Sequence, residues 1–162
     1  MPTDDSGRAL NLHLPDEAAT LRLGSVLASA IEPGLKVFLS GELGAGKTTL
    51  ARGLLSALGF AGRVKSPSYS LVELYVVSGL NLYHFDFYRF KQAIEFRDAG
   101  FGDYFDERNV CVVEWPEKAQ GELPAADLNI ALEIDGSSGR VAKLEPGTES
   151  GQRCIETLKR HL

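Results

Sequence analysis

An eight-residue stretch before position 50 constrains this chain more than any other. Residues 41–48 read GELGAGKT and match the phosphate-loop pattern G-x-x-x-x-G-K-[ST] at every fixed position. The preceding run, KVFLS at 36–40, has the β-branched and aromatic residues of a buried strand. After the motif, leucines recur every four residues over 50–58 and Gly59 ends the pattern, which predicts an amphipathic helix with a C-terminal glycine. The motif therefore lies at a strand-to-helix turn, the context in which it binds phosphate.

Each residue type in this loop has a physical role in holding phosphate. The glycines let the backbone bend into a nest and approach an anion with no Cβ in the way. The amides of the first helical turn and the positive end of the helix dipole favour negative charge there. Lys47 can place its ammonium against the β- and γ-phosphates, and the Thr48 hydroxyl can ligate Mg²⁺. The loop predicts nucleotide binding, and the alternative is a glycine-rich turn that matches by chance.

The composition limits the class of protein. With 162 residues, 44% hydrophobic and 24% charged, the chain is expected to form one soluble globular domain over residues 1–162. It has no apolar run near the ~20 residues that span a bilayer, and the acidic start MPTDDSGRAL is unlike a secretory signal. Cys111 and Cys154 lack metal-ligand spacing, which fits a reducing cytoplasm. With 17 basic and 22 acidic residues, net charge −5, it should bind nucleic acid poorly by itself.

Hydrophobic patterning along the chain predicts a fold class. Residues 60–70 are rich in small and hydroxyl side chains and are expected to form a loop beside the nucleotide, whereas 91–108 mix helical and loop signals. We expect an α/β fold: a single-domain, P-loop NTPase-like mixed β-sheet flanked by helices, with the phosphate site at the C-terminal edge of the strands. The expected strands are 9–14, 36–40, 71–77, 80–87, 109–114, 128–134 and 141–144, and the expected helices are 15–31, 50–58, 116–120 and the C-terminus.

Two acidic residues stand where a strand could deliver a carboxylate to the phosphates. Mg²⁺ in such sites usually takes one or two carboxylates together with phosphate oxygens and waters. Glu114 ends the most apolar strand of the chain, the position of a Walker-B acid. Asp86 lies on an alternating strand and could ligate the metal or orient the attacking water. For each acid the alternative is a strand-end carboxylate that caps a neighbouring helix.

Each of the other polar and aromatic residues near these acids allows a structural and a functional interpretation. His84 is either a satisfied strand histidine or a catalytic base. Trp115 directly follows Glu114 and either packs at the strand exit or lies near the nucleotide. Arg89 either stabilises charge at the site or forms a surface ion pair. The serines of the 60–70 loop either coordinate water or metal or make turn hydrogen bonds.

Four motifs together resemble a known family. They occur in the order GELGAGKTTLARG, VKSPSYSLVELY, YHFDFYR and VVEWPE. In this order and spacing they closely resemble the TsaE (YjeE) family, small bacterial P-loop ATPases of tRNA threonylcarbamoyladenosine biosynthesis. The resemblance runs from about residue 14 to about 124, and the chain after 125 carries little signature. In the loop, the family usually has SPT-[FY]-T where this chain has Ser68 and Ser70, so the hydroxyls remain and two methyl groups are lost.

The resemblance implies a partner-dependent ATPase. It would act with the threonylcarbamoyl transferase subunit and its companion, of TsaD/TsaB type, in N6-threonylcarbamoylation of adenosine 37 of tRNAs that read ANN codons. The partners would carry most of the tRNA contacts, and ATP hydrolysis would reset the complex between turnovers. By the resemblance, Thr48 and Glu114 would ligate Mg²⁺ and Asp86 would lie at the catalytic centre with Lys47. ATP or ADP would be held by Gly44, Ala45, Gly46, Lys47, Thr48 and Thr49, with Trp115 near the nucleotide and Glu17 close to the base.

Three other functions use the same loop. A small-molecule kinase would need an acceptor pocket and usually an arginine-bearing lid, and the sequence has no arginine-rich lid segment. A GTPase would need the guanine-reading N-K-x-D pattern, which this sequence lacks. An assembly module would bind ATP and hardly hydrolyse it. Substitution of Glu114 and Asp86 would separate that module from an ATPase.

Overall fold

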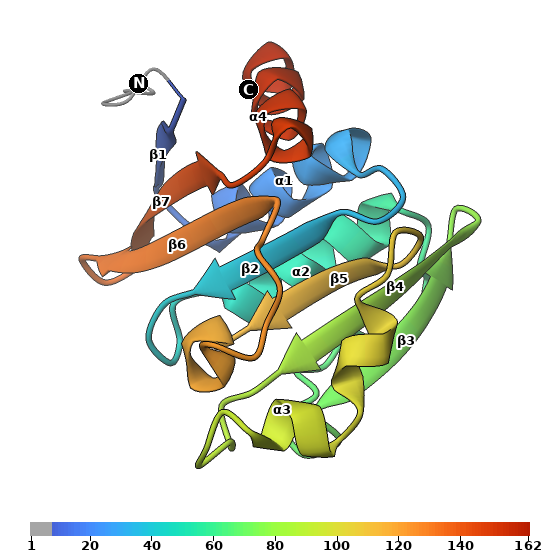
Figure 1. The fold of residues 1–162 in the computed structure, drawn as a ribbon. Helices are drawn as coiled ribbons and strands as arrows, with labels where there is room; N and C mark the ends of the chain where they lie inside the picture. The colour runs from blue at the N-terminus through green and yellow to red at the C-terminus, as the bar shows by residue number, and fades with distance from the viewer. Residues whose placement is uncertain (1–7) are drawn as a thin grey trace.

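The computed structural model describes residues 8–162, so predictions that concern the first seven residues lie outside it. Within this range, seven strands form one mixed sheet (Figure 1). In chain order they are β1 (Leu10–Leu14), β2 (Lys36–Ser40), β3 (Val72–Val77), β4 (Leu80–Asp86), β5 (Val110–Glu114), β6 (Leu128–Asp135) and β7 (Gly139–Pro146). The spatial order is β1-β7-β6-β2-β5-β4-β3. Neighbours among β6, β2, β5 and β4 are parallel, and antiparallel strands flank them.

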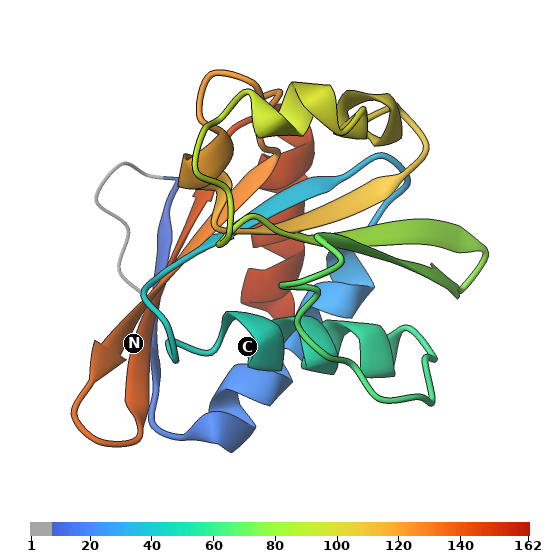
Figure 2. The same cartoon turned by 90° about the horizontal axis from the view of Figure 1, so that it is seen from below.

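Helices cover both faces of this sheet. The helical segments of the described range are α1 (Glu17–Leu27), η1 (Ala28–Ala30), α2 (Lys47–Ala57), α3 (Glu95–Asp98), η2 (Phe101–Tyr104), η3 (Pro116–Ala119) and α4 (Glu149–His161). Figure 2 shows the sheet between α1 and α2 on one side and α3 on the other. The predicted α/β fold, a P-loop NTPase-like mixed sheet flanked by helices, is confirmed. In residues 8–162 none of the helices has the length and apolarity needed to cross a membrane.

The two faces of the sheet bury different side chains. The face under α1, α2 and α4 is packed mainly with leucine, valine and isoleucine, whereas the opposite face is mainly aromatic. Because side chains alternate along a strand, Val110 and Val112 of β5 join the first cluster, and Cys111 and Val113 join the second. Both faces of β5 are buried, which explains its continuous apolar sequence. Glu114 continues the alternation and so belongs on the α2 side.

The hairpin predicted across residues 71–87 is confirmed, with Val77 paired to Leu80 at the turn. One helix boundary was wrong. The helix predicted to reach Ile31 ends as α1 at Leu27 and continues only as the tighter turn η1, and Ile31 is extended. The proline two residues further on disfavours helical backbone at the residue before it, so the chain leaves the helix early.

The segment of mixed signals, 91–108, folds through aromatic packing. It forms the short α3 and η2, and Phe101 lies with its ring centroid 5.4 Å from that of Phe85 on β4. Phe96 contacts Phe87 edge to face at 5.8 Å. These contacts are made with β4 and with the residue after it. They leave no helical periodicity in the sequence of the segment, so the sequence alone does not predict α3 and η2.

Candidate functional site

The loop between β2 and α2 has three glycines with positive φ, and two of them show why it needs glycine. Gly46, directly before α2, has φ +105°, and Gly41 has φ +145°. L-residues other than glycine are disfavoured in this region. A Cβ at Gly41 would also lie 2.5 Å from the carbonyl oxygen of Leu132. Since the first four amides of a helix have no partner within it, this backbone leaves N–H groups at the start of α2 for an anion.

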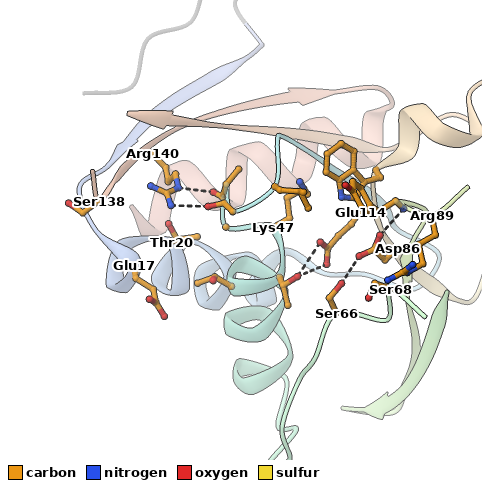
Figure 3. Close-up of a pocket in the computed structure, with 18 residues that line it drawn as sticks. Glu17, Thr20, Lys47, Ser66, Ser68, Asp86, Arg89, Glu114, Ser138 and Arg140 are labelled. Atoms are coloured by element: carbon orange, nitrogen blue, oxygen red, sulfur yellow. Dashed lines mark hydrogen bonds between the residues drawn. The ribbon is translucent and has the colours of Figure 1, made fainter. Parts of the chain in front are cut away.

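A cleft of about 530 Å³ opens at this loop (Figure 3). It lies at the carboxyl ends of β2, β4 and β5, the edge of a parallel sheet at which ligands bind. The cleft brings together all the residues predicted for the site, although α1, α2, β4 and β5 supply them from distant parts of the chain. These residues are Glu17, Gly44, Ala45, Gly46, Lys47, Thr48, Thr49, Asp86, Glu114 and Trp115.

Lys47 is the buried cation of the cleft. Its ammonium donates to the carbonyl oxygens of Gly41 and Glu42, the latter at 3.1 Å, and lies 4.1 Å from the ring centroid of Trp115. Burial lowers the pKa of Lys47, and the nearby carboxylates, led by Glu114, act against that shift. Neutral carbonyls are weaker acceptors for an ammonium than phosphate oxygens, so a phosphate group could take their place.

Glu114 links the phosphate-loop helix to the neighbouring strand. The Thr48 hydroxyl donates to its two carboxylate oxygens at 3.2 and 3.1 Å. On the other side, Nε2 of the fully buried His84 lies 2.6 Å from Oε2 of Glu114. A carboxylate can only accept, so Nε2 carries the proton. Nδ1 of His84 has no hydrogen-bond partner among the described residues. His84 is therefore a buried strand histidine that holds Glu114.

Asp86 stands beside Glu114 because β4 and β5 are parallel and pair these two residues in register. One oxygen of Asp86 accepts the Tyr88 backbone N–H at 2.9 Å, and the other accepts the Ser66 hydroxyl at 2.5 Å. Ser66 belongs to the 60–70 loop, so this contact brings the loop to the cleft. In residues 8–162 neither carboxylate accepts a helix amide, which sets aside the capping alternative.

Thr48 at the start of α2 and Glu114 at the end of β5 have side chains that suit Mg²⁺ as ligands. The Thr48 hydroxyl and the Glu114 carboxylate are hard oxygen ligands, they already touch, and both line the cleft at the anion-binding end of the helix. Mg²⁺ binds in such places through one or two carboxylates, with phosphate oxygens and waters completing its coordination. A phosphate group at the loop and a cation between Thr48 and Glu114 are therefore compatible with this side-chain arrangement.

Two aromatic contacts shape the same end of the cleft. Trp115 has φ 59° and ψ 49°, a left-handed conformation that bulky residues rarely adopt and that recurs at functional sites. Its ring lies 5.0 Å from that of Tyr88. The Arg89 guanidinium lies 4.0 Å from the ring centroid of the exposed Tyr69 in the 60–70 loop. Trp115 thus faces Lys47, and Arg89 reaches the cleft wall against an aromatic ring.

The other end of the cleft contains residues that sequence reasoning missed. Glu17 begins α1, and the buried Thr20 follows it by nearly one helical turn. Ser138 and Arg140 come from the β6–β7 turn and strand β7. Helical spacing could have placed Thr20 beside Glu17. The sequence predicted the hairpin, but no local pattern places its turn beside the phosphate loop.

Comparisons with known proteins agree with this fold and motif set. The family model described as "Threonylcarbamoyl adenosine biosynthesis protein TsaE" matches residues 14–142. The crystal structure of Bacillus subtilis YdiB superposes with a TM-score of 0.79 at 27% sequence identity, covering 99% of this chain and 97% of that one.

Curated relatives show the same similarity over nearly their whole length. The Haemophilus influenzae protein named tRNA threonylcarbamoyladenosine biosynthesis protein TsaE is 44% identical over 155 residues, covering 93% of this chain and 98% of the relative. The Bacillus subtilis protein of the same name is 33% identical over 147 residues, covering 91% and 90%. With a family model over most of its length and relatives this similar, the chain belongs to the TsaE family.

Proposed function

We propose that this protein binds and hydrolyses ATP with Mg²⁺ as a component of tRNA N6-threonylcarbamoyladenosine biosynthesis. One observation carries the ATPase part: the phosphate-loop helix contacts a strand-end acid through Thr48 and Glu114, and Asp86 stands next to Glu114 in the parallel register. An anion cradle, a metal-ligand pair and a second buried carboxylate then share one cleft. The names of the H. influenzae and B. subtilis relatives support the pathway.

The proposal assigns a task to the loop and to the charged residues that line the cleft. The loop of residues 44–49 holds the phosphates, mainly through the amides at the start of α2, and Lys47 leaves its loop carbonyls to contact the β- and γ-phosphate oxygens. Asp86, oriented by Ser66 and by the Tyr88 N–H, accepts a hydrogen bond from the attacking water and aligns it with the γ-phosphorus. Thr48 and Glu114 would hold Mg²⁺, which would supply positive charge beside the phosphate oxygens.

The partners in the proposal are the threonylcarbamoyl transferase subunit and its companion. The net charge of −5 is unfavourable for binding tRNA phosphates directly, so the partners carry most of the tRNA contact. ATP hydrolysis then resets the complex between turnovers, with no chemistry on the tRNA itself. A cytoplasmic location follows from this pathway.

Phosphate release from ATP, measured with and without purified partner subunits, tests the proposal. We expect a slow basal rate and a strong rise with the partners, and no phosphorylated acceptor when labelled ATP is supplied with candidate small molecules. Glu114→Ala and Asp86→Ala should lose hydrolysis and retain ADP binding. Unchanged tRNA modification in both variants would show instead that the protein is an assembly module. Repeated turnover of the modification enzymes without this protein would remove the reset role.

A further inference from the structure

Arg140 is the second cation that reaches the phosphate loop, and it contacts backbone atoms. Its Nε donates to the carbonyl oxygen of Ala45 at 3.0 Å, and its Nη2 donates to that of Gly44 at 2.9 Å (Figure 3). Its Nη1 donates to the carbonyl oxygen of Gly139 at 2.7 Å. All three guanidinium nitrogens are therefore directed at main-chain oxygens.

The backbone of Arg140 is also fixed. Arg140 lies on β7 between two neighbouring strands, paired with Leu14 of β1 and with Ile134 of β6. The Gly139 carbonyl holds the side chain at its free end. The guanidinium is therefore held in place from both ends, and its paired N–H groups form a fork directed at the loop.

This fork determines which way two consecutive peptide groups face. In a trans peptide, the carbonyl of one residue and the N–H of the next point in opposite directions. With the Ala45 carbonyl held by Arg140, the Gly46 N–H must point to the other side of the loop. Figure 3 shows Lys47 on the side away from Arg140. With the Gly44 carbonyl held as well, the Ala45 N–H also points away, and it donates to the Glu42 carbonyl at 3.1 Å.

The charge of Arg140 adds to its geometry. A hydrogen bond from a cation to a carbonyl polarises the whole peptide group, which strengthens the N–H of that group as a donor. Lysine could supply the charge, but its compact ammonium lacks the planar, side-by-side N–H groups with which the guanidinium bonds Ala45 and Gly44 while a third nitrogen bonds Gly139.

We propose that Arg140 is a positioning residue of the phosphate site: it fixes and polarises the Gly44–Ala45 and Ala45–Gly46 peptide groups so that the Gly46 amide is set to receive phosphate. This inference rests on the proposed function, because it assigns the loop to a nucleotide phosphate. This role differs from that of an arginine that stabilises the transition state directly, since each nitrogen of the Arg140 guanidinium donates to the protein backbone. Arg140 lies 95 residues after Ala45, beyond the four sequence motifs but within residues 14–142 that the family model matches.

Three variants of the full chain test this role. Arg140→Lys keeps the charge and loses the fork, Arg140→Met loses both, and Lys143→Met removes an exposed charge from the same strand as the matched control. For Mg-ADP binding by titration calorimetry, we expect Arg140→Lys and Arg140→Met each to weaken the affinity about tenfold, the loss expected for one or two backbone hydrogen bonds. Lys143→Met should bind as the wild type does.

A second readout does not depend on nucleotide. In ¹⁵N-labelled protein, the Gly46 amide resonance should shift in Arg140→Lys and Arg140→Met, while the amide of Leu54, in the interior of α2, stays in place. Wild-type affinity or an unshifted Gly46 amide in Arg140→Lys would overturn the inference, and so would an affinity lost only in Arg140→Met, because charge alone would then suffice. If the wild type fails to bind Mg-ADP, the proposed function fails, yet the Gly46 resonance still tests the positioning.

Wild-type protein provides a third measurement, in case neither Arg140 variant folds. The Arg140 Nε–H should exchange slowly with water because the Ala45 carbonyl holds it, whereas the Nε–H of the exposed Arg52 side chain on α2 should exchange quickly. Fast exchange at Arg140 would show that the fork is not formed in solution, and the inference would be wrong.

Discussion

The cleft has two charged walls, one at the ends of β4 and β5 and one formed by the β6–β7 hairpin. The charged groups of the first face the cavity, and that of the second faces the backbone of the loop. On the first wall, the buried carboxylates of Asp86 and Glu114 line the cavity and face what it would hold. On the second, the Arg140 guanidinium turns to the carbonyls of the loop. In the proposed function, the first wall would offer ligands to the substrate, and the second would determine the shape of the loop that receives it.

The comparison teaches that a charged residue in a cleft need not act on the ligand. The carboxylates of Asp86 and Glu114 line the cleft and keep lone pairs for a metal or water, whereas each nitrogen of the Arg140 guanidinium already donates to a backbone oxygen. Variants of the first wall should therefore change the rate of hydrolysis, and variants of the second should change affinity. The following predictions test this division.

The largest effect is expected from Lys47→Ala, which removes the ammonium between the two walls. We expect ATP hydrolysis to fall by about 10²–10³-fold, because the ammonium that stabilises the negative charge of the transferred phosphoryl group is lost. ADP affinity should fall less, because the backbone amides of the cradle remain. Phosphate release and ADP titration on the same preparation measure both, with Lys143→Ala as the control. Hydrolysis at the wild-type rate would contradict the assignment of Lys47.

Glu114→Gln should have the next largest effect and tests the acidic wall directly. Glutamine keeps the size and one oxygen but loses the negative charge that favours a dication, so hydrolysis should fall by about 10²-fold and require more Mg²⁺. ADP binding measured without metal should be unchanged. Glu117→Gln, an exposed acid on the turn after β5, is the matched control. An unaltered Mg²⁺ requirement in Glu114→Gln would place the metal elsewhere.

His84→Leu should affect stability and the metal together. Losing the 2.6 Å contact leaves a buried carboxylate with one partner fewer, which should lower the free energy of unfolding by about 1–3 kcal/mol. The Mg²⁺ concentration at half-maximal hydrolysis should rise, because Glu114 is no longer oriented. Urea unfolding and a Mg²⁺ titration measure the two effects, with the exposed His13→Leu as control. A stability loss with no change in Mg²⁺ response would make His84 purely structural.

The smallest effect on the cleft itself is expected from the thiols behind the two walls, which should make the stability of the fold depend on pH. Cys111 lies in β5 behind the acidic wall, and Cys154 lies in α4, which packs against β7. Burial raises the pKa of each thiol from 9.0 to about 12. The neutral thiol is thus favoured in the folded state, and its contribution is complete below pH 9 and lost as the pH rises towards 12. Each thiol should cost about 1.4 kcal/mol per pH unit in that window.

Urea unfolding between pH 9 and 11 measures this slope, and Cys154→Ser should reduce it by about half. Serine does not titrate in this range, so it isolates the thiol behind the hairpin wall. A slope that is equal in wild type and variant would mean that Cys154 reaches water in the folded state.

Sequence reasoning could predict one wall and not the other for a physical reason. The cradle is encoded by adjacent residues, and Asp86 and Glu114 stand at the ends of apolar strands, which parallel pairing must bring to one edge of the sheet. Arg140 follows an ordinary hairpin turn, and only the pairing of β6 with β2 places that turn beside the loop. Likewise, α3 and η2 are determined by contacts with phenylalanines of another strand.

The contact of Arg140 with Ala45 has a consequence for protein synthesis. A ribosome completes the GELGAGKT segment 80 residues before it reaches β6, and β6 and β7 supply the Leu132 carbonyl against Gly41 and the guanidinium on Ala45. A nascent chain that stops before residue 128 carries the full motif and lacks the two groups that set its shape. The loop therefore takes its final shape only after β6 and β7 have been translated and have paired with the rest of the sheet.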